Sequence, residues 1–191
     1  APWWIRNAQV SGRFVPFALW MGASLHDGLN PKATGASDME FLNEPAFWPL
    51  TESDQDRALT QTAWTFTRGQ PREAARLALV KAARFWCPWP NAETFQRPWL
   101  NLASALVTLP LYGLMILGLW RCRRDLRAWV LLAGPLLYFG ALHMIFVSSI
   151  RYRIPGMAPA MVLAAIGLAG WSWPGRLRLD VERRSERDSS G

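Results

Sequence analysis

Residues 98–120 read PWLNLASALVTLPLYGLMILGLW, a run of 23 residues without a charged side chain. Two further uncharged runs follow, with 23 residues at 128–150 and 22 residues at 154–175. A helix needs about 20 apolar residues to cross the hydrocarbon core of a bilayer, whereas helices of soluble proteins average about 10–14 residues. The runs therefore predict three transmembrane helices, at about 99–120, 128–149 and 154–174, and disfavour the alternative of helices buried in a soluble core.

Helix is the expected conformation of these runs, because a backbone surrounded by lipid must satisfy its own N–H and C=O groups. Pro110, Pro135 and Pro159 fall inside the runs and predict kinks for which neighbouring helices compensate. Glycines in the runs predict close helix–helix approach, at Gly113, Gly118, Gly134, Gly140, Gly167 and Gly170. Tryptophans near the ends of the runs predict contact with the membrane interface, at Trp99, Trp120, Trp129, Trp171 and Trp173.

Positive charge is concentrated beside the apolar runs. Of the net charge of +7, residues 1–98 contribute +1 (ten Lys/Arg, nine Asp/Glu) and residues 99–191 contribute +6 (eleven and five). Because cytoplasmic loops carry an excess of Lys and Arg, the turn at 121–127 and the basic tail at 176–191 are expected in the cytoplasm. Residues 1–98 and the short loop at 148–155 are then extracytoplasmic. The expected partner of this basic chain is a lipid bilayer and not a nucleic acid, since no soluble module with a basic face is visible.

The segment before the spans is expected to be a loop followed by a helical hairpin. Prolines, glycines and aromatic residues punctuate residues 1–50 and predict extended and looped structure. The first helix is expected to be capped by Ser53, with Asp56 in the capping-box position three residues on, and to stop at Gly69. The expected fold class is thus an all-α membrane protein with an extracytoplasmic loop and helix pair at 1–98, three transmembrane helices within 99–175 and a cytoplasmic tail at 176–191.

The second helix of the hairpin is expected at about 71–86, with Pro71 in its first turn. Its apolar side is expected to hold Ala75, Ala78, Leu79, Ala82, Phe85 and Trp86. Its basic side is expected to hold Arg76, Lys81 and Arg84. Two arrangements fit this pattern: an interfacial helix whose basic side meets lipid phosphates, and a hairpin packed on its own domain.

A set of short motifs occurs in the order found in a known family. The motifs are PWWIRN at 2–7, GRFVP at 12–16, NPKATG at 30–35, RFW at 84–86 and RYRIP at 151–155. In this order they resemble polytopic membrane glycosyltransferases of the GT-C type, in particular the protein-mannosyltransferase-like and aminoarabinose-transferase-like enzymes of family 39. The resemblance covers most of residues 2–170.

The resemblance implies an all-helical enzyme of the cell (inner) membrane, with several spans. Such enzymes move a sugar from a polyprenyl-phosphate donor to a protein, lipid or glycan acceptor at the extracytoplasmic face. Their catalytic acidic residue lies in the first extracytoplasmic loop near the N-terminus, so this chain is expected to be a C-terminal part, with no catalytic residue assigned in it. No cofactor is expected, and the lack of a nucleotide-binding glycine loop suits a lipid-linked donor.

Arg151 and Arg153 are the candidate donor-phosphate ligands. They lie at the start of a span on the side where the positive-inside rule disfavours them, and a guanidinium binds phosphate through a fork of charge-assisted hydrogen bonds. The alternative is contact with lipid headgroups by long interfacial side chains. Tyr152 between them, together with Arg6 and Asn7, is a possible site-loop residue, although anchoring of the loop also explains Arg6 and Asn7.

The remaining polar residues give weaker indications. Solvated loop charge is the expected role of Asp27, Asp38, Glu40 and Glu44, with acceptor binding or general-base work as the alternative. His143 is expected to hydrogen-bond to a neighbouring helix, and His26 is a lone histidine. No cluster has metal-ligand spacing, so no metal is expected.

A non-catalytic membrane scaffold or transporter subunit is the alternative function. Transporters often show internal repeats and polar groups in the middle of spans. In this sequence no repeat is visible and the spans hold no charge, which favours an enzyme with its chemistry at the outer face.

Overall fold

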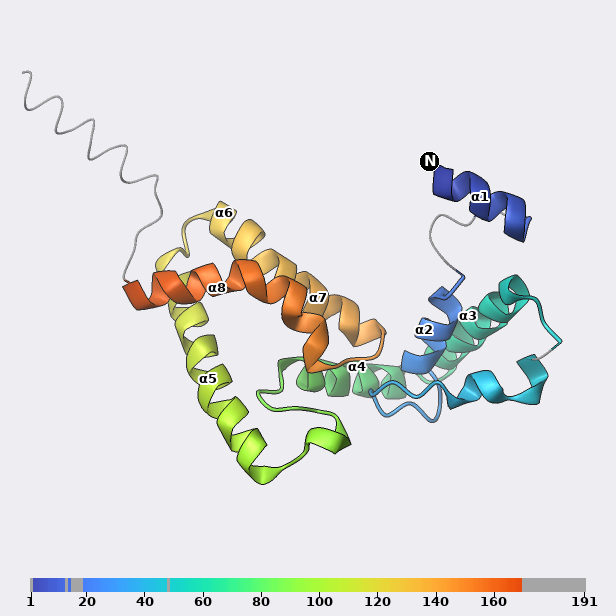
Figure 1. Ribbon diagram of the computed structural model, residues 1–191, viewed down its shortest axis with the longest axis horizontal. Helices are drawn as coiled ribbons and strands as arrows, with labels where there is room; N and C mark the ends of the chain where they lie inside the picture. Colours follow the sequence, from blue (N-terminus) through green and yellow to red (C-terminus); the bar gives the residue numbers. More distant parts are fainter. Residues whose placement is uncertain (1, 13, 15–18, 48, 170–191) are drawn as a thin grey trace, which may run out of the picture. The chain divides into compact units, whose positions relative to one another are not determined.

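The structure is a computed structural model, and it describes residues 2–12, 14, 19–47 and 49–169 (Figure 1). Every element in these residues is helical, which confirms the expected fold class. Several predictions lie outside the described residues: Gly170, Trp171, Trp173, the end of the third span and the tail at 176–191.

Among the described residues, three helical stretches are long and apolar enough to cross a membrane: Pro98–Arg121, Leu126–Ile145 and Ile150–Ala169. The first stretch is α5 (Pro98–Arg121). The second consists of α6 (Leu126–Ala128), the π-helical turn η4 (Trp129–Ala133) and α7 (Gly134–Ile145). The third consists of the 3-10 turn η5 (Ile150–Arg153) and α8 (Ile154–Ala169). The three predicted helices are confirmed, and the side of the membrane on which each end lies stays a prediction.

The prolines of the spans lie inside continuous helix. Pro110 is within α5 and Pro159 is within α8. Pro135 is the second residue of α7, just beyond η4, at whose end the N–H of Gly134 donates to the carbonyl of Trp129, five residues earlier. A proline ring crowds the carbonyl four residues before it and offers no N–H, and the wider π turn makes room for that ring.

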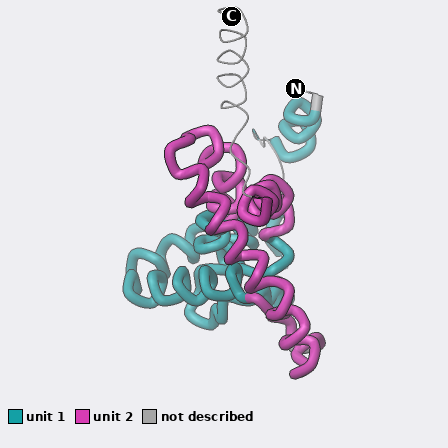
Figure 2. The backbone as a smooth tube through the Cα atoms, turned by 90° about the vertical axis from the view of Figure 1, so that its left-hand side faces the viewer, with its two compact units in different colours: residues 1–87, 140–152 teal, residues 88–139, 153–191 magenta. Residues whose placement is uncertain are grey.

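The chain divides into two compact units (Figure 2). Unit 1 consists of residues 1–87 and 140–152, and unit 2 consists of residues 88–139 and 153–191. The two units are defined by which residues contact one another. The predicted domains are defined by the side of the membrane on which each segment lies, and that assignment stays a prediction.

Unit 1 contains more helix than its sequence indicates. Its elements are α1 (Pro2–Ser11), α2 (Met21–Gly28), the 3-10 turns η1 (Glu40–Asn43) and η2 (Pro45–Phe47), α3 (Glu52–Gly69), α4 (Pro71–Trp86) and the last turns of α7. The prediction of extended structure is wrong for α1 and α2. Pro2 occupies the first position of α1, where a helix needs no N–H. Gly22 in α2 allows contact with α3, because an added Cβ would overlap the backbone carbonyl of Asp56.

The predicted start of α3 is wrong by two residues. Thr51 is the N-cap, and its hydroxyl accepts a hydrogen bond from the N–H of Asp54 at 3.3 Å. Ser53 therefore lies in the first turn. Asp56 is not part of a capping box, because its carboxylate accepts the N–H of Gly22 at 2.7 Å and joins α2 to α3. The predicted end at Gly69 and the predicted bounds of α4 are confirmed.

Unit 2 is packed through small residues. A Cβ at Gly118 of α5 would overlap the carbonyl oxygen of Leu163 in α8, and a Cβ at Gly167 of α8 would overlap the carbonyl oxygen of Leu114. These glycines confirm the predicted close approach of helices, whereas a Cβ at Gly113 would meet nothing within 4 Å. Arg121 completes this contact by donating to the carbonyls of Ile166 and Gly167 at 2.9 and 2.7 Å.

Candidate functional site

The segment that follows α7 is held in place by backbone hydrogen bonds within unit 1. The N–H of Ser148 donates to the carbonyl of Gly35 at 3.1 Å. The carbonyl of Ser148 accepts Nε–H of Arg84 at 3.4 Å. Gly35 has a φ of +86°, a left-handed conformation that glycine adopts without strain. The loop at 30–38 and the segment that carries Arg151 are therefore tied together.

Arg151 lies at the end of a series of stacked rings. Its guanidinium donates to the hydroxyl of Tyr152 at 3.0 Å, and its Cζ lies 5.0 Å from the centre of that ring. Tyr152 stacks on His143 with centroids 4.2 Å apart and planes at 11°. His143 in turn faces Phe85 of α4 at 6.2 Å. Phe85 is fully buried and Arg151 is exposed, so the series runs from the core of unit 1 to its surface.

His143 has a different hydrogen-bond partner from the one predicted. Its Nδ1 lies 2.8 Å from the carbonyl of Val147, just beyond the end of its own helix, so the prediction of a bond to a neighbouring helix is wrong. A carbonyl only accepts, which places the ring proton on Nδ1. The bond holds the imidazole plane against Tyr152, and it also satisfies a carbonyl that follows the last turn of α7.

Arg153 belongs to unit 2, although it is two residues from Arg151. It donates to the hydroxyl of Tyr112 in α5 at 2.6 Å, and its Cζ lies 5.6 Å from the centre of that ring. Both arginines thus contact a tyrosine. Arg153 joins two candidate spans through Tyr112, whereas Arg151 contacts Tyr152, the next residue in the chain. The phosphate-binding role stays a prediction for both, and the geometry favours the exposed Arg151.

Arg6 and Asn7 both lie in α1. The guanidinium of Arg6 lies 5.3 Å from the ring centre of Trp3, and the carbonyl of Asn7 accepts the hydroxyl of Ser11 at 2.7 Å. These contacts are local to the helix. The structure brings Arg151 and Tyr152 together, and the site role of Arg6 and Asn7 stays a prediction.

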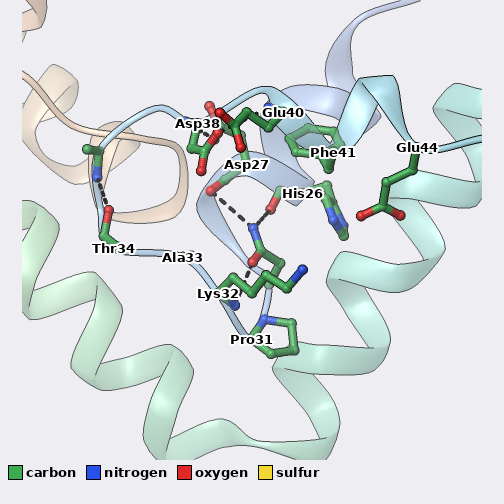
Figure 3. A pocket seen from close by; sticks show the side chains of 12 residues that line it. His26, Asp27, Pro31, Lys32, Ala33, Thr34, Asp38, Glu40, Phe41 and Glu44 are labelled. Atoms are coloured by element: carbon green, nitrogen blue, oxygen red, sulfur yellow. Dashed lines mark hydrogen bonds between the residues drawn. The ribbon is translucent and has the colours of Figure 1, made fainter.

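A cavity of about 490 Å³ lies between the end of α2 and the loop that leads to α3 (Figure 3). Its lining includes four carboxylates, one lysine and one histidine: Asp27, Asp38, Glu40, Glu44, Lys32 and His26. His26 packs edge-on against Phe41, with centroids 4.7 Å apart. Burial lowers the pKa of His26, against the opposing influence of Glu44 and Asp27. The predicted solvated character holds for Asp38, Glu40 and Glu44, which are exposed.

Asp27 corrects the prediction of solvated charge. Only 1% of it is exposed, and its carboxylate accepts the hydroxyl of Ser37 at 2.7 Å and the N–H of Asp38 at 2.8 Å. These bonds fold the loop over the end of α2. A buried carboxylate without such donors would be costly, so Asp27 shapes the cavity wall and is not a free surface charge.

Lys81 is the residue that sequence reasoning placed wrongly. The sequence pattern places it on the basic side of the helix with Arg76 and Arg84, but it is fully buried and donates to the carbonyl of Ile145, the last residue of α7, at 2.6 Å. Burial lowers the pKa of Lys81 to about 8, although nearby Asp27 acts to raise it. One signal could have indicated this position, since Lys81 lies four residues from both Leu77 and Phe85, which are also buried.

In the part of the chain that the structure describes, no three His, Cys, Asp or Glu side chains are grouped so that they could hold a metal ion. Cys87 and Cys122 are not joined by a disulfide bond.

Comparison with protein-family models, curated proteins and solved structures finds no match to this chain.

Proposed function

We propose that this chain is the C-terminal part of a membrane glycosyltransferase that uses a polyprenyl-phosphate-linked sugar, with Arg151 as a ligand of the donor phosphate. The observation that carries the proposal is the exposed Arg151 guanidinium, oriented by Tyr152 just after the second candidate span. The acceptor is a protein, lipid or glycan, and transfer takes place at the extracytoplasmic face of the cell membrane.

The chemistry of a lipid-linked donor suits this position. The polyprenyl chain of such a donor lies among acyl chains, so its phosphate lies at the membrane boundary. Ser148 and Tyr152 follow the candidate span that ends at Ile145, and a cation here meets a phosphate without crossing the apolar layer. In the transfer step the lipid phosphate is the leaving group, and a fixed cation stabilises the negative charge that develops on it.

The cavity beside His26 suits the acceptor side of this reaction. Its exposed carboxylates, Asp38, Glu40 and Glu44, accept hydrogen bonds from hydroxyl or amine groups. The loop that lines it is tied to the Arg151 segment through the bond between Ser148 and Gly35. Donor and acceptor groups would then meet on one compact unit, as a group transfer requires.

Binding of undecaprenyl phosphate to the full chain in detergent micelles tests the phosphate role. Charge-assisted hydrogen bonds contribute about 1.5–3 kcal/mol, so Arg151→Ala should weaken binding by roughly tenfold to a hundredfold. Arg151→Lys should retain part of the affinity through its charge. The measurement is native mass spectrometry over a range of lipid concentrations, with undecaprenol, which lacks the phosphate, as the ligand control.

Arg123→Ala is the matched control variant. Arg123 also stacks on an aromatic ring, with Cζ 4.8 Å from the ring centre of Trp120, but it lies in the turn predicted to be cytoplasmic. It should bind undecaprenyl phosphate as the unmodified chain does. Equal binding by the unmodified chain and Arg151→Ala, or an equal loss in Arg123→Ala, would rule out the proposed role.

A further inference from the structure

The second half of α4 exposes large apolar side chains although it buries a lysine beside Leu77 and Phe85. Lys81 is fully buried, whereas Leu79 is 67% exposed and Trp86 is 37% exposed. A helix that faces water exposes its lysines and buries its leucines. In α4, Lys81 is buried and Leu79, two residues earlier, is exposed. This arrangement indicates that the surroundings of the face that carries Leu79 are apolar.

From Arg72 onward, the exposed residues of α4 form a continuous stripe. They recur three or four positions apart along the helix: Arg72, Ala75, Arg76, Leu79, Ala83 and Trp86. The stripe is graded, because both arginines lie in its first half and Leu79, Ala83 and Trp86 lie in its second half. Arg76 and Trp86 are ten residues apart, which corresponds to about 15 Å along a helix axis.

Contacts within unit 1 place the C-terminal end of the stripe, at Trp86, beside a candidate span. Lys81 bonds to the carbonyl of Ile145, where that span ends. Phe85 and Trp86 lie against Gly140, since an added Cβ there would come within 3.4 and 3.7 Å of their rings. Lys81 thus contacts residue 145 of α7, and Trp86, further along α4, contacts residue 140. The C-terminal end of α4 therefore runs alongside a part of α7 that the predicted span places within the membrane.

We infer that the second half of the α4 stripe, Leu79, Ala83 and Trp86, lies in the lipid of the membrane interface, with Arg72 and Arg76 at the level of the phosphates. This lipid-facing surface of α4 is continuous with the apolar surface of the span that contains α7. A graded helix with arginines towards the headgroups and Trp and Leu among the acyl chains is the pattern of interfacial helices. The inference revises the face predicted from the sequence and holds whatever the chain catalyses.

Site-directed spin labelling of the full chain tests this inference. Cys87 and Cys122 are first replaced by serine, and Leu79→Cys and Ala83→Cys then each carry a nitroxide. The labelled chain is reconstituted into vesicles of phosphatidylcholine and phosphatidylglycerol. Its accessibility to oxygen, which concentrates in lipid, is compared with its accessibility to a water-soluble nickel chelate. Both labels should show an oxygen-to-nickel ratio several-fold higher than a label in water.

Gln61→Cys is the matched control, because Gln61 is an exposed polar residue in the neighbouring helix α3 of the same unit. Its label should be accessible to nickel. A nickel accessibility at positions 79 and 83 as high as at position 61 would show that the stripe faces water. Labels at 79 and 83 that neither reagent reaches would show that protein covers the stripe. Either result overturns the inference.

Discussion

In unit 1 buried polar side chains join the helices in addition to a close glycine contact at Gly22, whereas in unit 2 the close contact of α5 and α8 is made by glycines from both helices. Asp56 joins α2 to α3, Lys81 joins α4 to α7, and Asp27 holds the loop that follows α2. In unit 2, Gly118 and Gly167 let the backbones of α5 and α8 touch. Without water between apolar helices, close van der Waals contact is the main source of helix association. The comparison shows that one short chain uses two kinds of helix contact.

The largest expected effect is at the glycine contact. Gly118→Leu forces a side chain into the backbone of α8, and since backbone cannot move aside cheaply the cost should reach the upper end of the usual ~1–3 kcal/mol for overpacking, or exceed it. Thermal unfolding in detergent micelles measures it. Gly113→Leu lies in the same helix and meets nothing within 4 Å. Equal stability of the two variants would show that the contact at Gly118 does not hold α5 and α8 together.

The next effect concerns the polar contact at Lys81. Lys81→Met keeps much of the volume of the side chain but leaves the carbonyl of Ile145 without its donor, which should cost about 1–3 kcal/mol. The same unfolding measurement applies. Lys32→Met removes an exposed lysine of the same unit and should change stability by less than about 0.5 kcal/mol. A loss in Lys32→Met as large as in Lys81→Met would contradict the assignment.

The polar contact should also make stability depend on pH. The pKa of Lys81 is about 8 in the folded chain and has an ordinary value of 10.5. Between these values the unfolded chain binds more protons, so the free energy of unfolding should rise as pH increases from about 8 to 10.5. Below pH 8, Lys81 should add no pH dependence. The difference between the unmodified chain and Lys81→Met, followed from pH 7 to 10.5, isolates this contribution, and parallel curves would contradict it.

The smallest effect concerns the start of α3. Thr51→Ala removes the N-cap and should cost about 1 kcal/mol. Ser53→Ala, which changes the residue that the sequence pattern favours as the cap, should stay within about 0.5 kcal/mol of the unmodified chain. Helix content and unfolding of the two variants, compared side by side, decide between the caps. A larger loss in Ser53→Ala would restore the sequence-based assignment.

The three span helices and the helical hairpin could be predicted from the amino-acid sequence, because their signals are local. An uncharged run of sufficient length must be helical in lipid, and Gly69 with Pro71 marks the turn between α3 and α4. Local patterns did not reveal α1 and α2, whose sequences are rich in residues also found in loops.

The burial of polar groups and the contacts between distant side chains could be seen only in the folded chain. Asp27 is expected from the sequence as solvated loop charge, and Lys81 is expected on the basic side of a helix. Both are buried, and backbone groups outside their own helices satisfy them: the N–H of Asp38 and the carbonyl of Ile145. The ring series at Arg151 likewise joins α4, α7 and η5. Such contacts join segments that are far apart in the chain, so local sequence patterns cannot predict them.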